Sequence, residues 1–200
     1  MDKFKGKYRN ESIRLQNWDY GWAAAYFVTI CTKDRECFFG DVVDGVMRLS
    51  AIGEIAESEW LKTFEMRLDM NLTMGEFVVM PNHFHAIIGI GKNEYNSGDN
   101  CGDTMHCVPT IGTTTGNQTP KNRFGPQSKN LASIIRGFKI GVTRNARKIN
   151  PAFAWQSRFH DHIIRNEASF HRITRYIQNN PANWQGDTIH PDNREKNKNM

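Results

Sequence analysis

The chain has 200 residues, of which 38% are hydrophobic, and this is enough for one well-buried core. No internal repeat and no interdomain linker divides it, so we expect a single domain over 1–200. Its apolar runs are too short to span a membrane and its N-terminus is polar and charged. We therefore expect no membrane contact, no signal peptide and a cytoplasmic location.

The charge balance is mildly basic. Lys and Arg number 26 and Asp and Glu number 21, which gives a net charge of +5. An excess of this size is common in soluble proteins, so its distribution is more informative than its total. Basic residues gather in 1–20 and again in about 188–200, and both ends are expected to be flexible.

The first half of the chain contains strands and one amphipathic helix. Apolar segments predict strands over 25–32 and 46–49 and a helix over 51–64. A strand pair follows over 77–90, interrupted by Met80, Pro81 and Asn82. Because proline cannot donate to a sheet ladder, we expect a tight connection just before His83. The inward face of the helix is formed by Ile52, Ile55, Ala56 and Trp60.

His83 and His85 are two residues apart at the start of the second strand of this pair. A strand repeats its side-chain direction every second residue, so both imidazoles can reach one metal ion while Phe84 faces the other side. Two hydrogen-bonded surface histidines are the alternative. Two histidines leave most of a cation's coordination sphere open, which suits catalysis and requires a further ligand from elsewhere in the chain.

The only break in composition runs from about 91 to 125 and is rich in Gly, Asn, Thr and Ser. We expect a flexible insertion there. Its Cys101, His106 and Cys107 lack the paired spacing of a zinc site, and their role stays open. In a chain without a secretory signal, Cys31 and Cys37 are expected to be reduced thiols.

A second amphipathic helix is predicted over 131–148. One face is apolar, and another carries Arg136, Lys139, Thr143 and Arg147. This stripe can follow a phosphate backbone, although a solvated helix face is the more common outcome.

Residues 155–165 are expected to be extended and lead into a last helix, which ends before Pro181. Asp161 and His162 in the extended segment can orient a metal ligand or accept a proton, or can form a surface pair. On the helix, Tyr176 and Asn180 are four residues apart and so lie on one face. The helix therefore presents a phenol and an amide oxygen together.

These segments together resemble the REP-associated tyrosine transposases, which belong to the single-tyrosine HUH transposases. The resemblance covers about residues 14–183 and is carried by two motifs: Met-Pro-Asn-His-Phe-His over 80–85 and Tyr-Ile-Gln-Asn-Asn-Pro over 176–181. Further matching blocks lie over 25–40, 125–128, 136–139, 155–156 and 161–165.

The resemblance implies an α+β, ferredoxin-like HUH fold with helices packed on a central antiparallel sheet. It also implies metal-dependent cleavage of single-stranded DNA near a hairpin. In that reaction Tyr176 would be the nucleophile, and His83, His85 and Asn180 would hold Mg²⁺ or Mn²⁺. Related insertion-sequence transposases have Gln in place of Asn180, and the shorter amide must lie closer to the ion. The product would be a 5′-phosphotyrosine, and strands would be rejoined without ATP.

The expected partner is single-stranded or hairpin DNA, with candidate contacts at Arg14, Arg136, Lys139 and Arg147. The sequence leaves open whether the protein is a monomer or a homodimer. Two other functions stay open: a DNA-binding protein that does not cut, and a metal phosphoesterase that uses water as its nucleophile.

Overall fold

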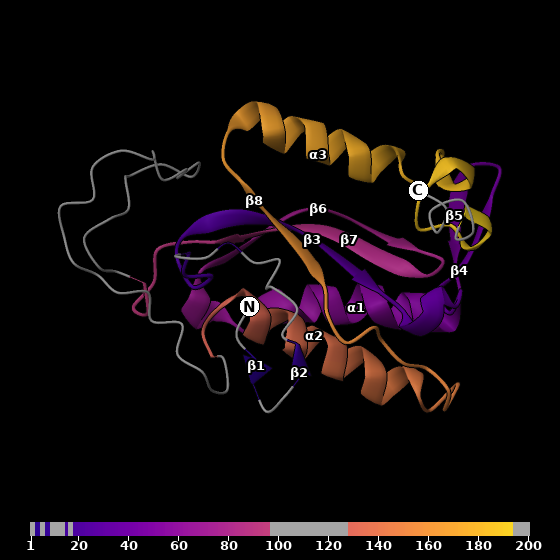
Figure 1. Cartoon of the computed structure of the whole chain (residues 1–200), viewed down its shortest axis with the longest axis horizontal. Coiled ribbons are helices and arrows are strands. Elements are labelled where there is room, and N and C mark those ends of the chain that lie inside the picture. Colours follow the sequence, from indigo (N-terminus) through magenta and orange to yellow (C-terminus); the bar gives the residue numbers. More distant parts are fainter. Residues whose placement is uncertain (1–2, 5–6, 9–14, 16–17, 97–127, 194–200) are drawn as a thin grey trace.

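The computed structural model describes residues 3–4, 7–8, 15, 18–96 and 128–193. Four antiparallel strands form the central sheet in the order β6-β7-β3-β8. Helices α1 and α2 cover one face of this sheet, and α3 lies across the other (Figure 1). The α+β class and the central antiparallel sheet predicted from the sequence are therefore confirmed.

The bounds of the strands and helices follow the predicted order. The sheet consists of β3 (Ala24–Cys31), β6 (Leu72–Met80), β7 (His83–Ile90) and β8 (His160–Ile164). The helices are α1 (Ala51–Glu65), α2 (Leu131–Ala146) and α3 (Glu167–Asn179). Two small separate sheets are formed by β1 (Lys3–Phe4) with β2 (Lys7–Tyr8), and by β4 (Gly40–Val43) with β5 (Val46–Leu49).

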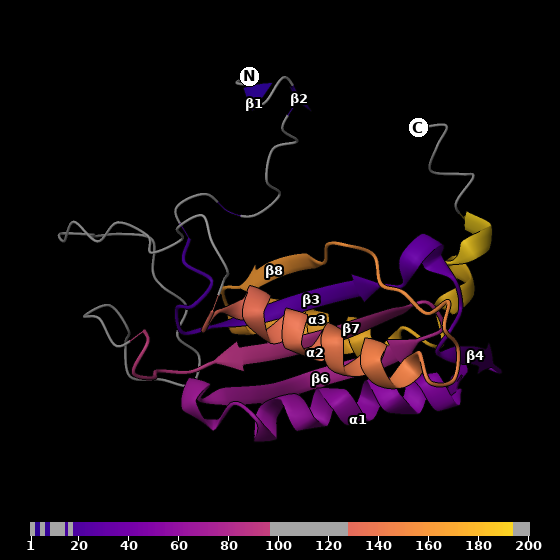
Figure 2. The same cartoon turned by 90° about the horizontal axis from the view of Figure 1, so that it is seen from below.

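The central strand β7 separates two hydrophobic clusters because its alternate side chains point to opposite faces. Phe84, Ala86 and Ile88 belong to the main core beneath α1 and α2, which lie side by side in Figure 2. Ile87 belongs to a smaller cluster with Ile173 and Ile177 of α3. His83 and His85 alternate with the main-core residues, so they lie on the α3 face.

Local signals fix the start of each long helix. Ser50, Asn130 and Asn166 are the N-cap residues of α1, α2 and α3, and each side chain accepts a hydrogen bond from a backbone N–H of the first turn. The tight connection predicted before His83 is also present, since β6 ends at Met80 and β7 begins at His83. The two motif histidines are consequently placed at the very start of a central strand.

Two strand segments were not predicted. β4 pairs with β5 through a turn at Asp44 and Gly45, whose φ angles of 53° and 74° suit a two-residue hairpin. β6 begins at Leu72, five residues before the predicted start at 77. Its first half is partly exposed, with Thr73 and Met74 at the surface, and contains Gly75, where a Cβ atom would lie 2.8 Å from the side chain of Ile87. A glycine in a partly exposed edge segment without regular alternation gives little strand signal.

Candidate metal and tyrosine site

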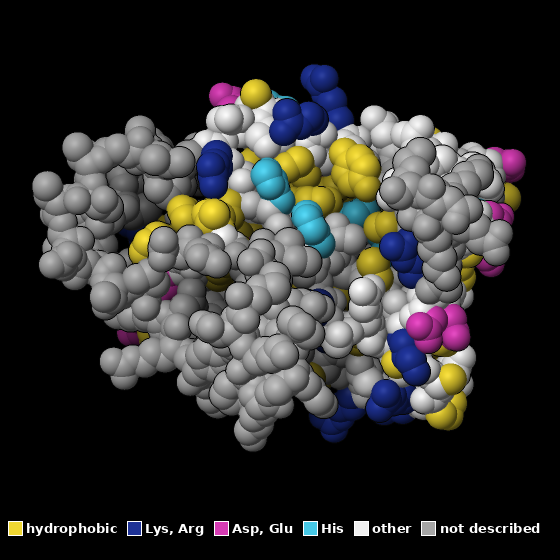
Figure 3. All heavy atoms as spheres, viewed as in Figure 1, with side chains coloured by type: hydrophobic (Ala, Val, Ile, Leu, Met, Phe, Trp, Pro, Cys, Tyr) yellow, Lys and Arg dark blue, Asp and Glu magenta, His cyan; other side chains and the backbone are white. Residues whose placement is uncertain are grey.

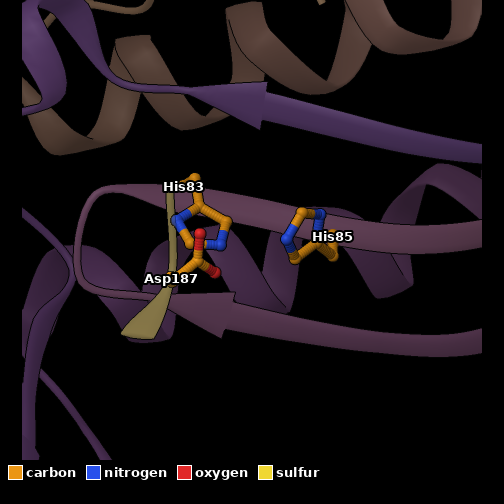
Figure 4. A group of neighbouring side chains, drawn as sticks. All are labelled: His83, His85 and Asp187. Carbon is orange, nitrogen blue, oxygen red and sulfur yellow. The ribbon is translucent and has the colours of Figure 1, made fainter. Parts of the chain in front are cut away.

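The α3 face of the sheet carries the residues that the two sequence motifs single out. Figure 3 looks onto the β8 edge of the sheet and shows histidine side chains near the centre of the view, with hydrophobic side chains beside them. His83 and His85 are 0% and 1% exposed, and their ring centroids are 4.4 Å apart. Figure 4 shows both rings extending from β7 on the same side, with Asp187 beside His83. The alternation that the sequence predicted for this pair thus produces two adjacent, buried imidazoles.

Asn82 determines which nitrogen of His83 is protonated. Nδ2 of Asn82 donates to the carbonyl oxygens of Arg35 and Ile189, which orients the amide. Oδ1 of Asn82 therefore faces Nδ1 of His83, 2.8 Å away. Because this oxygen can only accept, Nδ1 of His83 carries the proton and Nε2 has a free lone pair. Nε2 is buried and has no hydrogen-bond partner, so it is available as a metal ligand.

His85 is oriented by two residues of β3. Oγ1 of Thr29 lies 2.8 Å from Nδ1 of His85, and Phe27 stacks on the imidazole with a centroid distance of 5.3 Å. The hydroxyl of Thr29 can accept a hydrogen bond from the Nδ1–H of His85, which leaves the Nε2 lone pair for a metal ion. Neither Thr29 nor Phe27 was identified from the sequence, because their proximity to His85 depends on the register of β3 with β7.

Tyr176 is placed over His85 by the packing of α3. Ile173 and Ile177 anchor the helix on the sheet, and the hydroxyl of Tyr176 lies 3.2 Å from Nε2 of His85. Tyr176 is 44% exposed, so a polymer substrate can approach it from solvent. Partial burial and the nearby charge of Asp187 raise the pKa of Tyr176 to about 12. The phenol is therefore neutral at physiological pH.

Asn180 is the C-cap of α3 and is buried at the same site. Its Nδ2 donates to Oδ2 of Asp187 at 3.1 Å, while its Oδ1 is buried and has no hydrogen-bond partner. Unpartnered buried polar atoms are rare in folded proteins. Among the described residues there are three such side-chain atoms, and two of them, on His83 and Asn180, belong to this site.

Asp187 was not singled out from the sequence. It follows a short 3-10 helix, Trp184–Gly186, in a segment with no periodic pattern that would have indicated its position. A carboxylate oxygen of Asp187 and one nitrogen each of His83 and His85 all lie within 4.8 Å of one another. These three residues form a group that could hold a metal ion.

Electrostatics at the site favours neutral imidazoles. Burial lowers the pKa of His83 to about 3, although the adjacent Asn180 side chain partly opposes this effect. Burial and the neighbouring His83 lower the pKa of His85 well below its ordinary value. Neutral imidazole is the form that binds metals, and oxygen ligands such as an amide and a carboxylate suit Mg²⁺ or Mn²⁺. The donor set therefore fits a divalent cation.

The predicted DNA contacts on α2 lie on the opposite face of the sheet. Arg136, Lys139 and Arg147 line a groove of about 730 Å³ between α2 and residues 154–159. Lys139 donates to the carbonyl oxygen of Gln156, and Arg147 donates to that of Phe153. Partial burial lowers the pKa of Lys139 to about 8. Arg14 lies outside the described residues.

Asp161 and His162 are adjacent on β8, so they point to opposite faces of the sheet. His162 is opposite Phe27 in the register and shares the α3 face, whereas Asp161 is opposite Val28, a main-core residue. Only His162 is thus on the same face as the histidine pair. Cys101, His106, Cys107 and most of the expected insertion lie outside the described residues.

Among the helices in the described part of the chain, none is both long and apolar enough to cross a membrane. This finding agrees with the short apolar runs of the sequence.

The fold is similar to that of a solved REP-associated tyrosine transposase bound to a REP hairpin. The TM-score is 0.52 at 17% identity, and the match covers 86% of this chain and 73% of that one. This likeness supports the HUH fold expected from the two sequence motifs.

The chain also has a close relative in sequence. It is 36% identical over 192 residues to an uncharacterized protein of Haemophilus influenzae, and the match covers 94% of this chain and 96% of that protein. The chain belongs to the same family as this Haemophilus protein. No family model matches it.

Proposed function

We propose that this protein is a metal-dependent endonuclease and strand transferase that acts on single-stranded DNA beside a hairpin. The hydroxyl oxygen of Tyr176 attacks a phosphodiester phosphorus, and the bond from phosphorus to the 3′ oxygen breaks. The phenol loses its proton and the departing 3′ oxygen gains one. A 5′-phosphotyrosine and a free 3′ hydroxyl result, and a second 3′ hydroxyl can reverse the attack to join strands.

The observation that carries this proposal is that four polar atoms lie together at one site. The hydroxyl of Tyr176 lies 3.2 Å from Nε2 of His85, and the unpartnered Nε2 of His83 and Oδ1 of Asn180 are buried beside it. A half-buried surface tyrosine without a catalytic role would not require two unpartnered buried polar atoms next to its hydroxyl. A tyrosine nucleophile beside a set of metal ligands accounts for these atoms, because the ligand atoms are left free to bind the ion.

Each residue has a role that its surroundings support. His83, His85 and Asn180 would hold Mg²⁺ or Mn²⁺, with Asp187 beside them as a further oxygen donor. A bound cation would supply charge stabilisation for the phenolate and for the phosphate oxygens. Tyr176 needs such help because its pKa is raised to about 12 and its phenol is neutral at physiological pH. Thr29 and Asn82 hold the imidazoles in orientation.

The DNA partner is inferred from the charge distribution and from the related fold. The solved structure of similar fold is that of a transposase bound to a REP hairpin. In this chain we assign backbone contacts to Arg136, Lys139 and Arg147 along the α2 groove, and to Arg14. Lys139 and Arg147 already hold backbone carbonyls, so their side chains are ordered before any DNA binds.

The test is incubation of the protein with end-labelled hairpin DNA from the genomic flanks of its own gene, with Mg²⁺ or Mn²⁺. A denaturing gel should show a protein-linked band that requires the ion. The band should disappear in Tyr176→Phe and in His83→Ala. Tyr95→Phe is the matched control because it removes another exposed phenol, one that bonds to Asp69 away from the site, and it should keep the band.

Other outcomes would contradict the proposal in distinct ways. Cleavage that persists in Tyr176→Phe would mean that water is the nucleophile and that the protein is a phosphoesterase. Salt-dependent hairpin binding without cleavage by the wild type would mean that the protein only recognises DNA.

A further inference from the structure

A second group of basic side chains lies beside the tyrosine site, at the junction of β8 and α3. In the register of the sheet, His160 is opposite Thr29 and His162 is opposite Phe27. Thr29 contacts His85, and Phe27 lies against both His85 and Tyr176. His160 and His162 are therefore one strand beyond the residues that flank the reacting groups. Both are exposed, and Figure 3, which looks onto the β8 edge, shows histidine side chains at the surface.

Helix α3 contributes an arginine, Arg172, on the side that faces β8. Arg172, Tyr176 and Asn180 are spaced four residues apart, so they form one column along the helix. Gln178 lies on the other flank of α3, where it donates to Glu76 of β6. Since β6 and β8 are the two opposite edges of the sheet, the column of Arg172 and Tyr176 faces the β8 side. Arg172 is held there by a hydrogen bond of 3.3 Å to Oγ of Ser169.

These side chains are close enough to influence one another. Partial burial lowers the pKa of His162, and the positive charges of His160, Arg165 and Arg172 lower it further. Within the described parts of the chain, no carboxylate forms an ion pair with any of these four residues. Of the acids nearest in sequence, Glu167 contacts His171, and Asp161 is on the opposite face, although its negative charge acts on His162 and opposes part of the lowering of its pKa. The result is a local excess of positive charge.

We propose that His160, His162, Arg165 and Arg172 form a phosphate-binding track for single-stranded DNA. This inference rests on the proposed function and extends it. Neighbouring strands lie ~4.8 Å apart, so β8 is roughly 10 Å from β7. The track therefore binds phosphates next to the scissile one, not the scissile phosphate itself. Guanidinium groups suit phosphate geometry, and the exposed imidazoles and the Tyr176 ring offer flat surfaces to unstacked bases.

The track explains how the strand is kept in line with the nucleophile. Arg172 is one helical turn before Tyr176, so a phosphate bound to Arg172 places the next part of the strand over the phenol. The α2 groove is on the opposite face of the sheet and cannot perform this positioning. The hairpin and the cleaved strand would thus occupy different faces of the protein.

The experiment measures binding of a fluorescent single-stranded oligonucleotide by anisotropy, in EDTA and over a series of salt concentrations. Arg172→Gln and Arg165→Gln should each weaken binding by about 3- to 10-fold and reduce the slope of log K against log salt by roughly 0.7 per lost phosphate contact. Arg172→Lys should keep the slope. Lys62→Gln removes one positive charge from α1 on the other face and should bind like the wild type.

A second measurement, of Mn²⁺ affinity, distinguishes a variant that has lost a DNA contact from one that is misfolded. Mn²⁺ affinity without DNA should be unchanged in the Arg172 and Arg165 variants, because neither residue contacts the metal donors. If both glutamine variants bind the oligonucleotide with wild-type affinity and slope, the proposed phosphate-binding track is refuted, even if the wild type forms the tyrosine adduct. If both variants lose strand binding but the wild type forms no adduct, the phosphate-binding track is supported and the proposed strand-transfer reaction is refuted.

Discussion

Oγ1 of Thr29 and Nδ1 of His85 are 2.8 Å apart, although the two residues are separated by 56 positions in the chain. The contact joins neighbouring strands β3 and β7 and sets the orientation of a proposed metal ligand. When the hydroxyl accepts a hydrogen bond from Nδ1–H, the Nε2 lone pair of His85 is directed toward the metal donors and Tyr176. Thr29 is thus the counterpart of Asn82, which sets His83 in the same way.

Replacing Thr29 with valine should weaken metal binding without disturbing the fold. The shape of the side chain is kept, but His85 loses its orienting partner, and losses of such partners lower metal affinity by about 10- to 100-fold. Mn²⁺ binding measured by calorimetry on the DNA-free protein tests this. The matched control is Thr63→Val on α1, where a buried hydroxyl donates to the carbonyl of Glu59 far from the metal donors. Equal Mn²⁺ affinity in the two variants would contradict the assigned role of Thr29.

Asn82→Asp should act differently from Asn82→Ala. The aspartate keeps an acceptor for Nδ1 of His83 but loses the amide that donates to Arg35 and Ile189. We expect Asn82→Ala to lower Mn²⁺ affinity by about 10-fold or more, and Asn82→Asp to lower it less. Thermal unfolding of both variants shows how much of the change comes from the lost anchoring of residues 35 and 189. An alanine variant with wild-type affinity would show that the imidazole is oriented by packing alone.

The parts of this site that could be predicted are those defined by local spacing. The period of two along a strand placed His83 and His85 on one face, and the helical spacing of four placed Tyr176 with Asn180. Thr29 and Asp187 could not be found this way, because their positions depend on the strand register and on an irregular segment after α3. The same alternation along β8 places Asp161 and His162 on opposite faces of the sheet, although the sequence suggested both as residues that could orient a metal ligand or accept a proton.

Asp187 should matter for metal binding through its contact with Asn180. Oδ2 of Asp187 accepts from Nδ2 of Asn180, so the other amide atom, Oδ1, faces His83. Asp187→Ala removes this acceptor and a nearby carboxylate, and should lower Mn²⁺ affinity by roughly 10- to 100-fold. Asp187→Asn keeps an acceptor oxygen and should bind more tightly than the alanine variant. If calorimetry finds Mn²⁺ affinity unchanged in Asp187→Ala, the carboxylate has only a structural role.

DNA binding at the α2 groove should weaken as the pH rises through about 8. Burial lowers the pKa of Lys139 from 10.5 to about 8, so its charge is present below that pH and is lost above it. The nearby thiol of Cys31 has a raised pKa and stays neutral over most of this range. Between pH 7 and pH 9 the slope of log K against log salt for duplex DNA should fall by roughly 0.9. Lys139→Arg should remove this pH dependence, and an arginine variant with the same pH dependence would refute the assignment.

The docking of α3 on the sheet should be more important for strand transfer than for metal binding. Ile177 on α3 and Ile134 on α2 are both 0% exposed, and they pack on opposite faces of the sheet. Replacing either with alanine should lower the free energy of unfolding by about 2–5 kcal/mol, as urea denaturation can measure.

Only Ile177→Ala loosens the helix that holds Tyr176 near His85. At a temperature where both variants are fully folded, adduct formation should therefore fall by about 10-fold or more in Ile177→Ala and stay near wild type in Ile134→Ala. Equal loss of adduct in both variants would mean that transfer depends on overall stability and not on the position of α3.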